Sequence, residues 1–285
     1  MAVLLEEIVR RVNDLPVLPR VVARVLTLTG NPNSSIKELN DAICKDQALT
    51  VKVLRLSNSA YYSYHRRIAT ITDAIGILGF TAIRNLVLVT HTSTYFNKGL
   101  KGYRITKGDI FRHSVTCAMA ARSIAKHARF PSPDSAFTAG LLHDVGKVIL
   151  DVYVGAAYDE IARQMQEEQQ VFSTVEDAIL GFTHAAVGGR VAERWNLPTE
   201  LVEAIACHHT PLEASENPQL AAIVHIADAV CLSMEIDTEG DGLYYPYEGQ
   251  ALVLAGLEST DLAVIKSELR ELVSDENIFQ LENKR

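Results

Sequence analysis

Histidine and aspartate are the residue types of this sequence whose spacing could support chemistry. Five of the nine histidines and two aspartates follow one another along the chain: His113, His143, Asp144, His184, His208, His209 and Asp228. Neutral imidazoles and carboxylates are common ligands of divalent transition metals, so the series could hold a metal ion. Taken singly, however, a histidine on an apolar helix face is more often a hydrogen-bonded core residue. His113 and His184 both lie on such faces by their spacing.

Asp228 favours the metal interpretation. It is the only charged side chain between Glu216 and Glu235, within an apolar helical run. An ionised carboxylate buried there without a partner would cost several kcal/mol, and a shared cation removes that cost. The alternative is a structural salt bridge. Because no Lys or Arg lies between Arg194 and Lys266, its partner would have to come from a distant segment.

Two helices are expected to position the paired residues. For the helix that carries His143 and Asp144, Ser132 can cap the start and Pro133 suits the first helical position. His208 and His209 end another helix just before Thr210-Pro211, where the negative end of the helix dipole favours a cation. Both histidines reach one site most easily where the last turn loosens.

The elements that position these residues are predicted to be helices throughout, and the fold class is all-α. Helices are expected at residues 3–13, 18–29, from Ser34 or Ser35 to about 44, 47–58, 71–78, 81–92, 109–127, 133–150, 156–170, 174–195, 199–209 and 219–235, with two short ones after a loop at 236–249, the second capped near Ser259. We divide the chain into an N-terminal lobe (1–105), a central bundle (106–235) and a C-terminal loop and helices (236–285).

Composition argues against two classes of partner. The 285 residues carry a formal net charge of −8, a sign that repels nucleic-acid phosphates and anionic lipid. His65-Arg66-Arg67 is the one candidate basic patch, and we interpret it as a solvated turn. The helices joined at Gly79-Phe80 invite a helix-turn-helix interpretation, but the second is too apolar to lie in a DNA groove and is expected in the core.

The cysteines and the N-terminus indicate a cytoplasmic location. Cys44, Cys117, Cys207 and Cys231 are far apart and form no CxxC pair, so no disulfide framework is implied, and those in apolar runs are expected to act as small hydrophobes. An acidic pair at Glu6-Glu7 does not fit a signal peptide. No apolar run approaches the roughly 18 residues of a membrane span, and we expect no membrane association.

Several motifs resemble a known family. Leu141-Leu142-His143-Asp144-Val145-Gly146-Lys147 resembles the signature of the HD superfamily of metal-dependent phosphohydrolases. From about Leu15 to Met234 the chain resembles its HDOD branch, a bacterial signalling module related to HD-GYP phosphodiesterases. The motifs that carry this resemblance are Leu15-Pro16-Val17-Leu18-Pro19, Asp46-Gln47-Ala48-Leu49-Thr50, Leu56-Ser57-Asn58-Ser59-Ala60, Ala74-Ile75-Gly76-Ile77-Leu78-Gly79, Trp195-Asn196-Leu197-Pro198 and His208-His209. The resemblance implies an HD-like helical bundle with an additional N-terminal helical lobe.

The resemblance also implies a ligand set. One metal would be held by His113, His143, Asp144 and Asp228, and a second by His184, His208 and His209 with Asp144 as a bridge. Oxygen and imidazole ligands fit iron or manganese better than structural zinc, while zinc, nickel and magnesium stay open. Two such ions would position a hydroxide for attack on a phosphoester, with Asp144 and Lys147 in catalytic roles. Lys147 could instead be a surface lysine at a helix end.

The chain departs from the HD-GYP pattern after the paired histidines. Those enzymes continue with a Glu and an Asp-Gly-x-Gly-Tyr-Pro motif, whereas here Thr210-Pro211-Leu212-Glu213 follows. The similar text at Asp241-Gly242-Leu243-Tyr244-Tyr245-Pro246 comes after Asp228, in the wrong place, and we treat it as chance.

Three functions compete. The first is a signalling module that retains a metal centre and acts through protein partners, which would deliver any input because no receiver, kinase or cyclase domain is recognisable. The second is an active phosphohydrolase on a phosphoester such as a nucleotide or cyclic dinucleotide. The third, a DNA-binding regulator, rests only on the turn at Gly79 and is opposed by the net charge.

Overall fold

The computed structural model describes residues 18–62, 66–168, 170–234 and 249–274. The expected helix at 3–13, residue His65 of the basic patch and the expected loop at 236–248 lie outside these ranges. The all-α prediction is confirmed: within the described ranges there are helices and one isolated antiparallel bridge, between Leu100 and Ile105. The chain divides into two compact units. We call Phe96–Lys266 the central unit, and Pro16–Tyr95 with Ser267–Arg285 the N-terminal unit.

The N-terminal unit contains α2 (Arg20–Gly30), α3 (Ile36–Cys44), α4 (Gln47–Ser57), the 3-10 turn η1 (Ala60–Tyr62) and α5 (Ile71–Phe96). Helices α3 and α4 begin where the sequence predicted, and each has a capping side chain at its start. The Ser35 hydroxyl and the Glu38 carboxylate form a reciprocal capping box, and the Asp46 carboxylate accepts the amide N–H of Leu49 at 3.0 Å. Asn58 then exchanges two hydrogen bonds of 2.9 Å with the backbone of Ile68, which fixes the chain between α4 and α5.

Helix α5 contains the break expected at Gly79, whose φ of 83° and ψ of 168° interrupt the helical backbone. The residues after it are buried, including Ile83, Val87 and Leu88, so this half is core as predicted. By length and mean hydropathy (1.5) α5 also qualifies as a membrane span, which the sequence pattern did not single out. Half of that stretch is buried inside the protein, as in a core helix of a globular unit.

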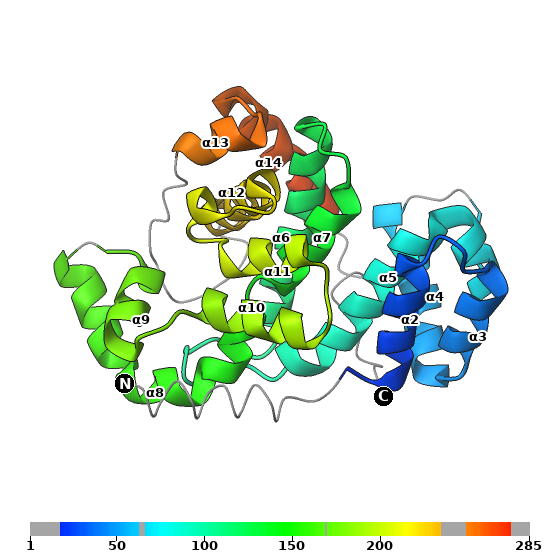
Figure 1. Ribbon diagram of the computed structural model, residues 1–285, viewed down its shortest axis with the longest axis horizontal. Helices are drawn as coiled ribbons and strands as arrows, with labels where there is room; N and C mark the ends of the chain where they lie inside the picture. Colours follow the sequence, from blue (N-terminus) through cyan, green and yellow to red (C-terminus); the bar gives the residue numbers. More distant parts are fainter. Residues whose placement is uncertain (1–17, 63–65, 169, 235–248, 275–285) are drawn as a thin grey trace. The chain divides into compact units, whose positions relative to one another are not determined.

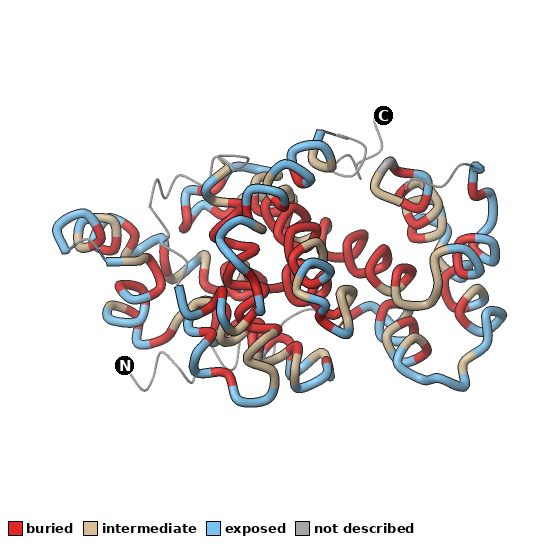
Figure 2. Tube along the Cα trace, turned by 90° about the horizontal axis from the view of Figure 1, so that it is seen from above, coloured by how far each residue is buried: buried red, intermediate tan, exposed pale blue. Residues whose placement is uncertain are grey.

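The central unit contains α6 (Asp109–His127), α7 (Pro133–Leu142), α8 (Val145–Glu168), α9 (Phe172–Leu180), α10 (His184–Arg194), α11 (Thr199–Ala206), η2 (Pro211–Glu213), α12 (Pro218–Ser233), α13 (Gly249–Ala255) and the start of α14 (Ser259–Val273). Helix α6 packs on α7 and α12, and α10 packs on α8 and α11. In Figure 1, α13, α12, α11 and α10 follow one another from the top of the central unit downwards. Most residues of α6 and α12 are buried. Figure 2 colours the buried residues of the described ranges red.

Four predicted helix details are wrong, and three of them fall at the site. The expected helix 133–150 ends at Leu142, and α8 starts at Val145 and runs through the expected gap at 151–155. The expected helix 174–195 is broken by Gly181, whose φ is 83°, so that His184 is the first residue of α10. Helix α11 ends at Ala206, which leaves both paired histidines in the turn that follows.

The fourth correction concerns the start of α7. Pro133 stands in the first turn as expected, but the Ser132 side chain makes no capping bond to the backbone. Its hydroxyl instead forms a 2.8 Å hydrogen bond with the hydroxyl of Ser135. The backbone of Ser132 has φ −129° and ψ 76°, and its hydroxyl bonds to a side chain instead of to the backbone of α7.

Close backbone contacts in the central unit depend on glycine. A Cβ on Gly146 would lie 1.9 Å from the carbonyl oxygen of His184, so α8 and α10 touch backbone to backbone. A Cβ on Gly140 would lie 2.8 Å from the carbonyl oxygen of Cys117, so α7 and α6 also pack closely. The two contacts place the His143-Asp144 turn between α6 and α10.

Candidate metal centre

The seven side chains singled out by the sequence converge in the central unit. They come from α6, the α7–α8 turn, the start of α10, the turn after α11, and α12, in the order His113, His143 and Asp144, His184, His208 and His209, and Asp228. Six are almost inaccessible to solvent, at 5% exposure or less, and His209 is half-buried. Five chain segments therefore contribute to one buried polar cluster.

One side of the cluster joins His113, His143 and Asp228. The Oδ1 atom of Asp228 lies 3.1 Å from Nε2 of His113 and 3.7 Å from Nε2 of His143. The Oδ2 atom of Asp144 lies 3.3 Å from Nε2 of His143 and 3.7 Å from Nε2 of His113. We call these four residues the first ligand group. In the described ranges, the carboxylate of Asp228 thus lies beside two imidazoles, and no Lys or Arg pairs with it.

The other side joins His184, His208 and His209. The Nε2 atoms of His184 and His209 approach to 2.8 Å. The second oxygen of Asp144, Oδ1, lies 3.4 Å from Nε2 of His184 and 4.0 Å from Nε2 of His208. We call these three histidines with Asp144 the second ligand group. Asp144 therefore presents one oxygen to each group, which is the arrangement of a carboxylate that can bridge two cations.

Two of the buried imidazoles, those of His143 and His208, each have one nitrogen committed to a backbone carbonyl. Nδ1 of His143 donates to the carbonyl oxygen of Gly140 at 2.7 Å, and Nδ1 of His208 donates to that of Ile205 at 2.8 Å. Their Nε2 atoms are buried and have no hydrogen-bond partner among the described residues. A buried acceptor without a partner costs free energy, and a second hydrogen bond that fixes the tautomer is typical of metal-binding histidines. The residues present therefore fit divalent cations.

The pKa shifts of His208, His209 and Asp228 favour the same conclusion. His184 differs, because burial would lower its pKa but the carboxylate of Glu176 outweighs burial and raises it. Burial, together with neighbouring His143 and His184, lowers the pKa of His208 to about 3, and burial and His208 lower the pKa of His209 well below its usual value. Burial alone would raise the pKa of Asp228, but the hydrogen bond from His113 and the neighbouring imidazole of His143 outweigh it and lower that pKa. Neutral imidazoles and an ionised carboxylate at pH 7 are the forms that bind metals.

Lys147 is not a surface lysine. Its side chain is buried on the first turn of α8, and its Nζ lies 2.9 Å from Oδ2 of Asp144. Burial would raise the pKa of Asp144, but the neighbouring imidazole of His143 and the ammonium of Lys147 outweigh it, so that the pKa lies well below its usual value. An ammonium at this point can balance a carboxylate or an anionic ligand at the cluster.

Three polar residues at the cluster carry no clear sequence signal. Glu176 on α9 is fully buried, and its Oε2 accepts hydrogen bonds of 2.7 Å from both Nδ1 and the backbone N–H of His184. Tyr103 donates its hydroxyl to Oε1 of Glu176 at 2.7 Å. Cys117, expected to be a small hydrophobe, is buried, and its Sγ lies 3.4 Å from Nε2 of His113. Its i+4 spacing from His113 was the one available hint.

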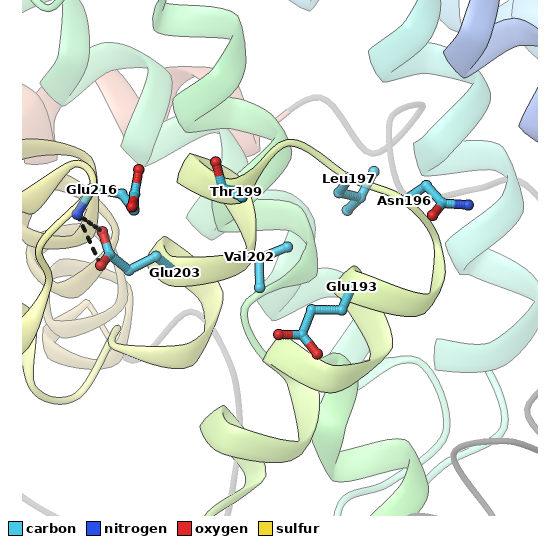
Figure 3. A pocket seen from close by; sticks show the side chains of 7 residues that line it. All are labelled: Glu193, Asn196, Leu197, Thr199, Val202, Glu203 and Glu216. Atoms are coloured by element: carbon cyan, nitrogen blue, oxygen red, sulfur yellow. Dashed lines mark hydrogen bonds between the residues drawn. The ribbon is translucent and has the colours of Figure 1, made fainter.

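The surface of the central unit has a hollow of about 540 Å³ (Figure 3). None of the seven residues of the cluster lines it. It lies along α10 and α11 at the Trp195-Asn196-Leu197-Pro198 motif, and three glutamates contribute to it. One of them, Glu203, accepts the backbone N–H groups of Ser215, Glu216 and Asn217, so its carboxylate caps a turn. Asn196 ends α10 with a φ of 52°. These residues have structural roles.

The comparisons with known proteins identify the family. The sequence profile of the HDOD domain matches residues 15–211. The chain belongs to the HDOD domain family. It is 26% identical over 248 residues to an uncharacterised protein of Treponema pallidum, covering 84% of this chain and 45% of that one, so the chain spans about half the length of this curated relative.

Two solved structures share the fold of this HDOD chain. An HDOD domain protein of unknown function from Geobacter sulfurreducens superposes with a TM-score of 0.78 at 26% identity, covering 97% of this chain and 98% of that one. A candidate phosphohydrolase from Shewanella amazonensis gives a TM-score of 0.75 at 24% identity, covering 96% and 97%. The HDOD fold and the His/Asp cluster together make this an HD-type protein with a metal-binding centre.

Proposed function

We propose that this chain is a bacterial, cytoplasmic signal-transduction protein whose cluster holds one or two divalent cations, with iron or manganese favoured, and which acts mainly through contacts with protein partners. The observation that carries the metal part is the position of Asp144, which offers Oδ2 to the first ligand group and Oδ1 to the second. The unpartnered Nε2 atoms of His143 and His208 support it.

The burial of the ligands supports a regulatory role over rapid turnover. A hydrolytic metal site needs an open coordination position that substrate and water can reach. Here the side chains of both ligand groups are nearly inaccessible, and only His209 is half-buried. Metal occupancy can therefore change how α6, α8, α10 and α12 are held together, and such a change could be sensed by a partner protein.

Phosphoester hydrolysis is the second candidate. It is supported by the bridging geometry of Asp144 and by the buried ammonium of Lys147 beside it. Proteins of similar structure have been assigned to both functions. One from Shewanella amazonensis is a candidate phosphohydrolase, and one from Marinobacter aquaeolei is a candidate signal transduction protein. At 24% and 21% identity they show only that the fold is shared, so the choice between the two functions depends on the residues of the site.

An activity assay with a matched variant separates the two. The protein would be loaded with Fe(II) or Mn(II) and incubated with a generic phosphodiester and a panel of nucleotides and cyclic dinucleotides. The regulatory proposal predicts full metal occupancy with no turnover above that of Asp144→Asn. Metal-dependent turnover that Asp144→Asn abolishes would instead establish the phosphohydrolase.

A further inference from the structure

His184 differs from two other histidines of the cluster in what fixes its ring. His143 and His208 are each fixed by a carbonyl oxygen of the helix that precedes them, α7 and α11 respectively. His184 is fixed by the carboxylate of Glu176, which comes from the neighbouring helix α9. That carboxylate takes three hydrogen bonds of 2.7 Å, from Nδ1 and N–H of His184 and from the hydroxyl of Tyr103. All three residues are buried, so no solvent competes for these bonds.

Tyr103 belongs to a short turn that follows α5 in the chain. Residues 99–106, which we call the connector turn, are closed by hydrogen bonds of 3.0 and 2.9 Å between Leu100 and Ile105. The connector turn comes three residues after Phe96, where the central unit resumes in the chain. Its Tyr103 touches the support of the metal cluster at two places: the hydroxyl bonds to Glu176, and the ring centre lies 6.0 Å from Nζ of Lys147.

The connector turn is held on α8 at several points. The Oδ1 atom of Asp151 accepts the N–H groups of Gly102 at 2.7 Å and Tyr103 at 3.3 Å. A Cβ on Gly102 would lie 1.7 Å from the carbonyl oxygen of Asp151, so backbone meets backbone there. The guanidinium of Arg104 lies 4.4 Å from the ring centre of Tyr158 and pairs with Asp159. A shift of the turn would thus move Tyr103 relative to α8.

We propose that Tyr103 and Glu176 are positioning residues that make cation binding by the second ligand group depend on the connector turn. Glu176 holds Nδ1 of His184 so that Nε2 faces Asp144 and His209, and Tyr103 holds Glu176. None of these three hydrogen-bonded residues, Tyr103, Glu176 and His184, belongs to the first ligand group. A displacement of the connector turn therefore weakens the second cation selectively. This inference rests on the proposed metal binding and adds its regulation.

The test counts cations in matched variants. Mn(II) binding to the unsubstituted protein, Tyr103→Phe, Glu176→Gln and Asp151→Ala would be measured by electron paramagnetic resonance and calorimetry. Outer hydrogen-bond partners of metal ligands typically contribute about 10- to 100-fold in affinity. We expect the first Mn(II) to bind equally in all four proteins. The second should bind about 10-fold more weakly in Tyr103→Phe and Asp151→Ala, and about 100-fold more weakly in Glu176→Gln.

Tyr158→Phe is the control, because it removes a hydroxyl from a tyrosine that packs on Arg104 of the same turn. It should leave both affinities unchanged. A second readout needs no metal: the Nδ1–H proton of His184, hydrogen-bonded to a carboxylate, should resonate far downfield in ¹⁵N-edited NMR spectra and move in Tyr103→Phe. The dispersion of the backbone amide signals of each variant reports separately whether it is folded.

The outcomes are distinct. Equal binding of the second Mn(II) in Tyr103→Phe and Glu176→Gln would overturn the positioning role while leaving metal binding intact. Binding of a single Mn(II) by the unsubstituted protein would also overturn it, because no second group would then exist. If the unsubstituted protein bound neither Mn(II) nor Fe(II), the proposed function and this inference would be overturned together.

Discussion

Lys147 and Asp144 form the one lysine–carboxylate pair among the residues that meet at the cluster in the described ranges. The 2.9 Å separation and the burial of both side chains mean that the ammonium occupies the neighbourhood in which a cation would sit. A buried charge whose partner is removed is strongly destabilising. Lys147 therefore stabilises the metal-free state and repels an incoming cation.

Lys147→Met separates these effects. We expect the free energy of unfolding of the metal-free protein to fall by about 3 kcal/mol, because Asp144 loses its ammonium partner. Mn(II) should bind ~10-fold or more tightly, because a like charge is removed. Calorimetry and urea denaturation measure the two quantities. Weaker Mn(II) binding in the variant would show that Lys147 supports the site in another way.

His91, which lies on α5 in the N-terminal unit, makes the stability of the protein depend on pH. Burial lowers its pKa to about 4, against about 6.5 in the unfolded chain, and its Nε2 has no hydrogen-bond partner among the described residues. The folded state then binds fewer protons than the unfolded state between pH 4 and 6.5, so stability falls as the pH drops through this window. At pH 5 the loss amounts to about 2 kcal/mol relative to pH 7.

His91→Gln should remove the part of the pH dependence of stability that His91 causes. The comparison is the urea midpoint of the metal-free protein and of the variant between pH 7 and pH 5. We expect a smaller drop for the variant. Identical pH slopes would mean that His91 is solvated or paired in solution.

At the scale of elements, the contact between α8 and α10 brings His143, Asp144 and His184 together. Gly146→Ala would place a methyl group 1.9 Å from the carbonyl oxygen of His184 and 2.7 Å from the backbone nitrogen of Gly188, so the helices must separate. We expect a loss of about 3 kcal/mol in the free energy of unfolding and weaker binding of the second cation.

Gly76→Ala in α5 is the matched control. A Cβ there meets no atom within 4 Å, and alanine is favoured over glycine inside a helix by about 0.5–1 kcal/mol. The variant should be slightly more stable, with unchanged Mn(II) binding. Equal stability of Gly146→Ala and the unsubstituted protein would contradict the close contact between α8 and α10.

The helices were predictable where local signals agree. The span 109–127 matches α6 at both ends, and Ser35 and Asp46 start α3 and α4 as caps. The breaks at the site were missed because apolar periodicity continues across them. His143 and Asp144 form a tight turn between two helices, with the amide of Lys147 bonded to the carbonyl oxygen of Asp144 at 3.0 Å. Gly181 and Thr183 did carry a stop and a start signal.

The site was predictable in its ligands but not in their supports. Asp228 could be recognised because it is a single charged residue in an otherwise apolar helix. Glu176 did not, because its neighbour Asp177 makes α9 look like an ordinary amphipathic helix. Tyr103 lies 73 residues before Glu176 in the chain, so their hydrogen bond depends on tertiary packing.

At the scale of the whole molecule, all seven proposed ligands belong to the central unit, and the N-terminal unit supplies none. Cations that bind only the folded state stabilise it by about 2.7 kcal/mol at 100 times the dissociation constant. The single tryptophan, Trp195, lies in the central unit and reports its unfolding. We expect saturating Mn(II) to raise the melting temperature followed by tryptophan fluorescence, and a chelator to reverse the rise. An unchanged melting temperature would contradict the coupling of binding to folding.

Metal content is the measurement that tests the central claim most directly. The protein and its Asp144→Asn and Asp228→Asn variants would be purified without chelator and analysed by elemental mass spectrometry. Our account predicts one or two equivalents of iron or manganese per chain in the unsubstituted protein and a large loss in both variants. An unsubstituted protein that stays metal-free after incubation with both metals, or variants that retain the same content, would contradict it.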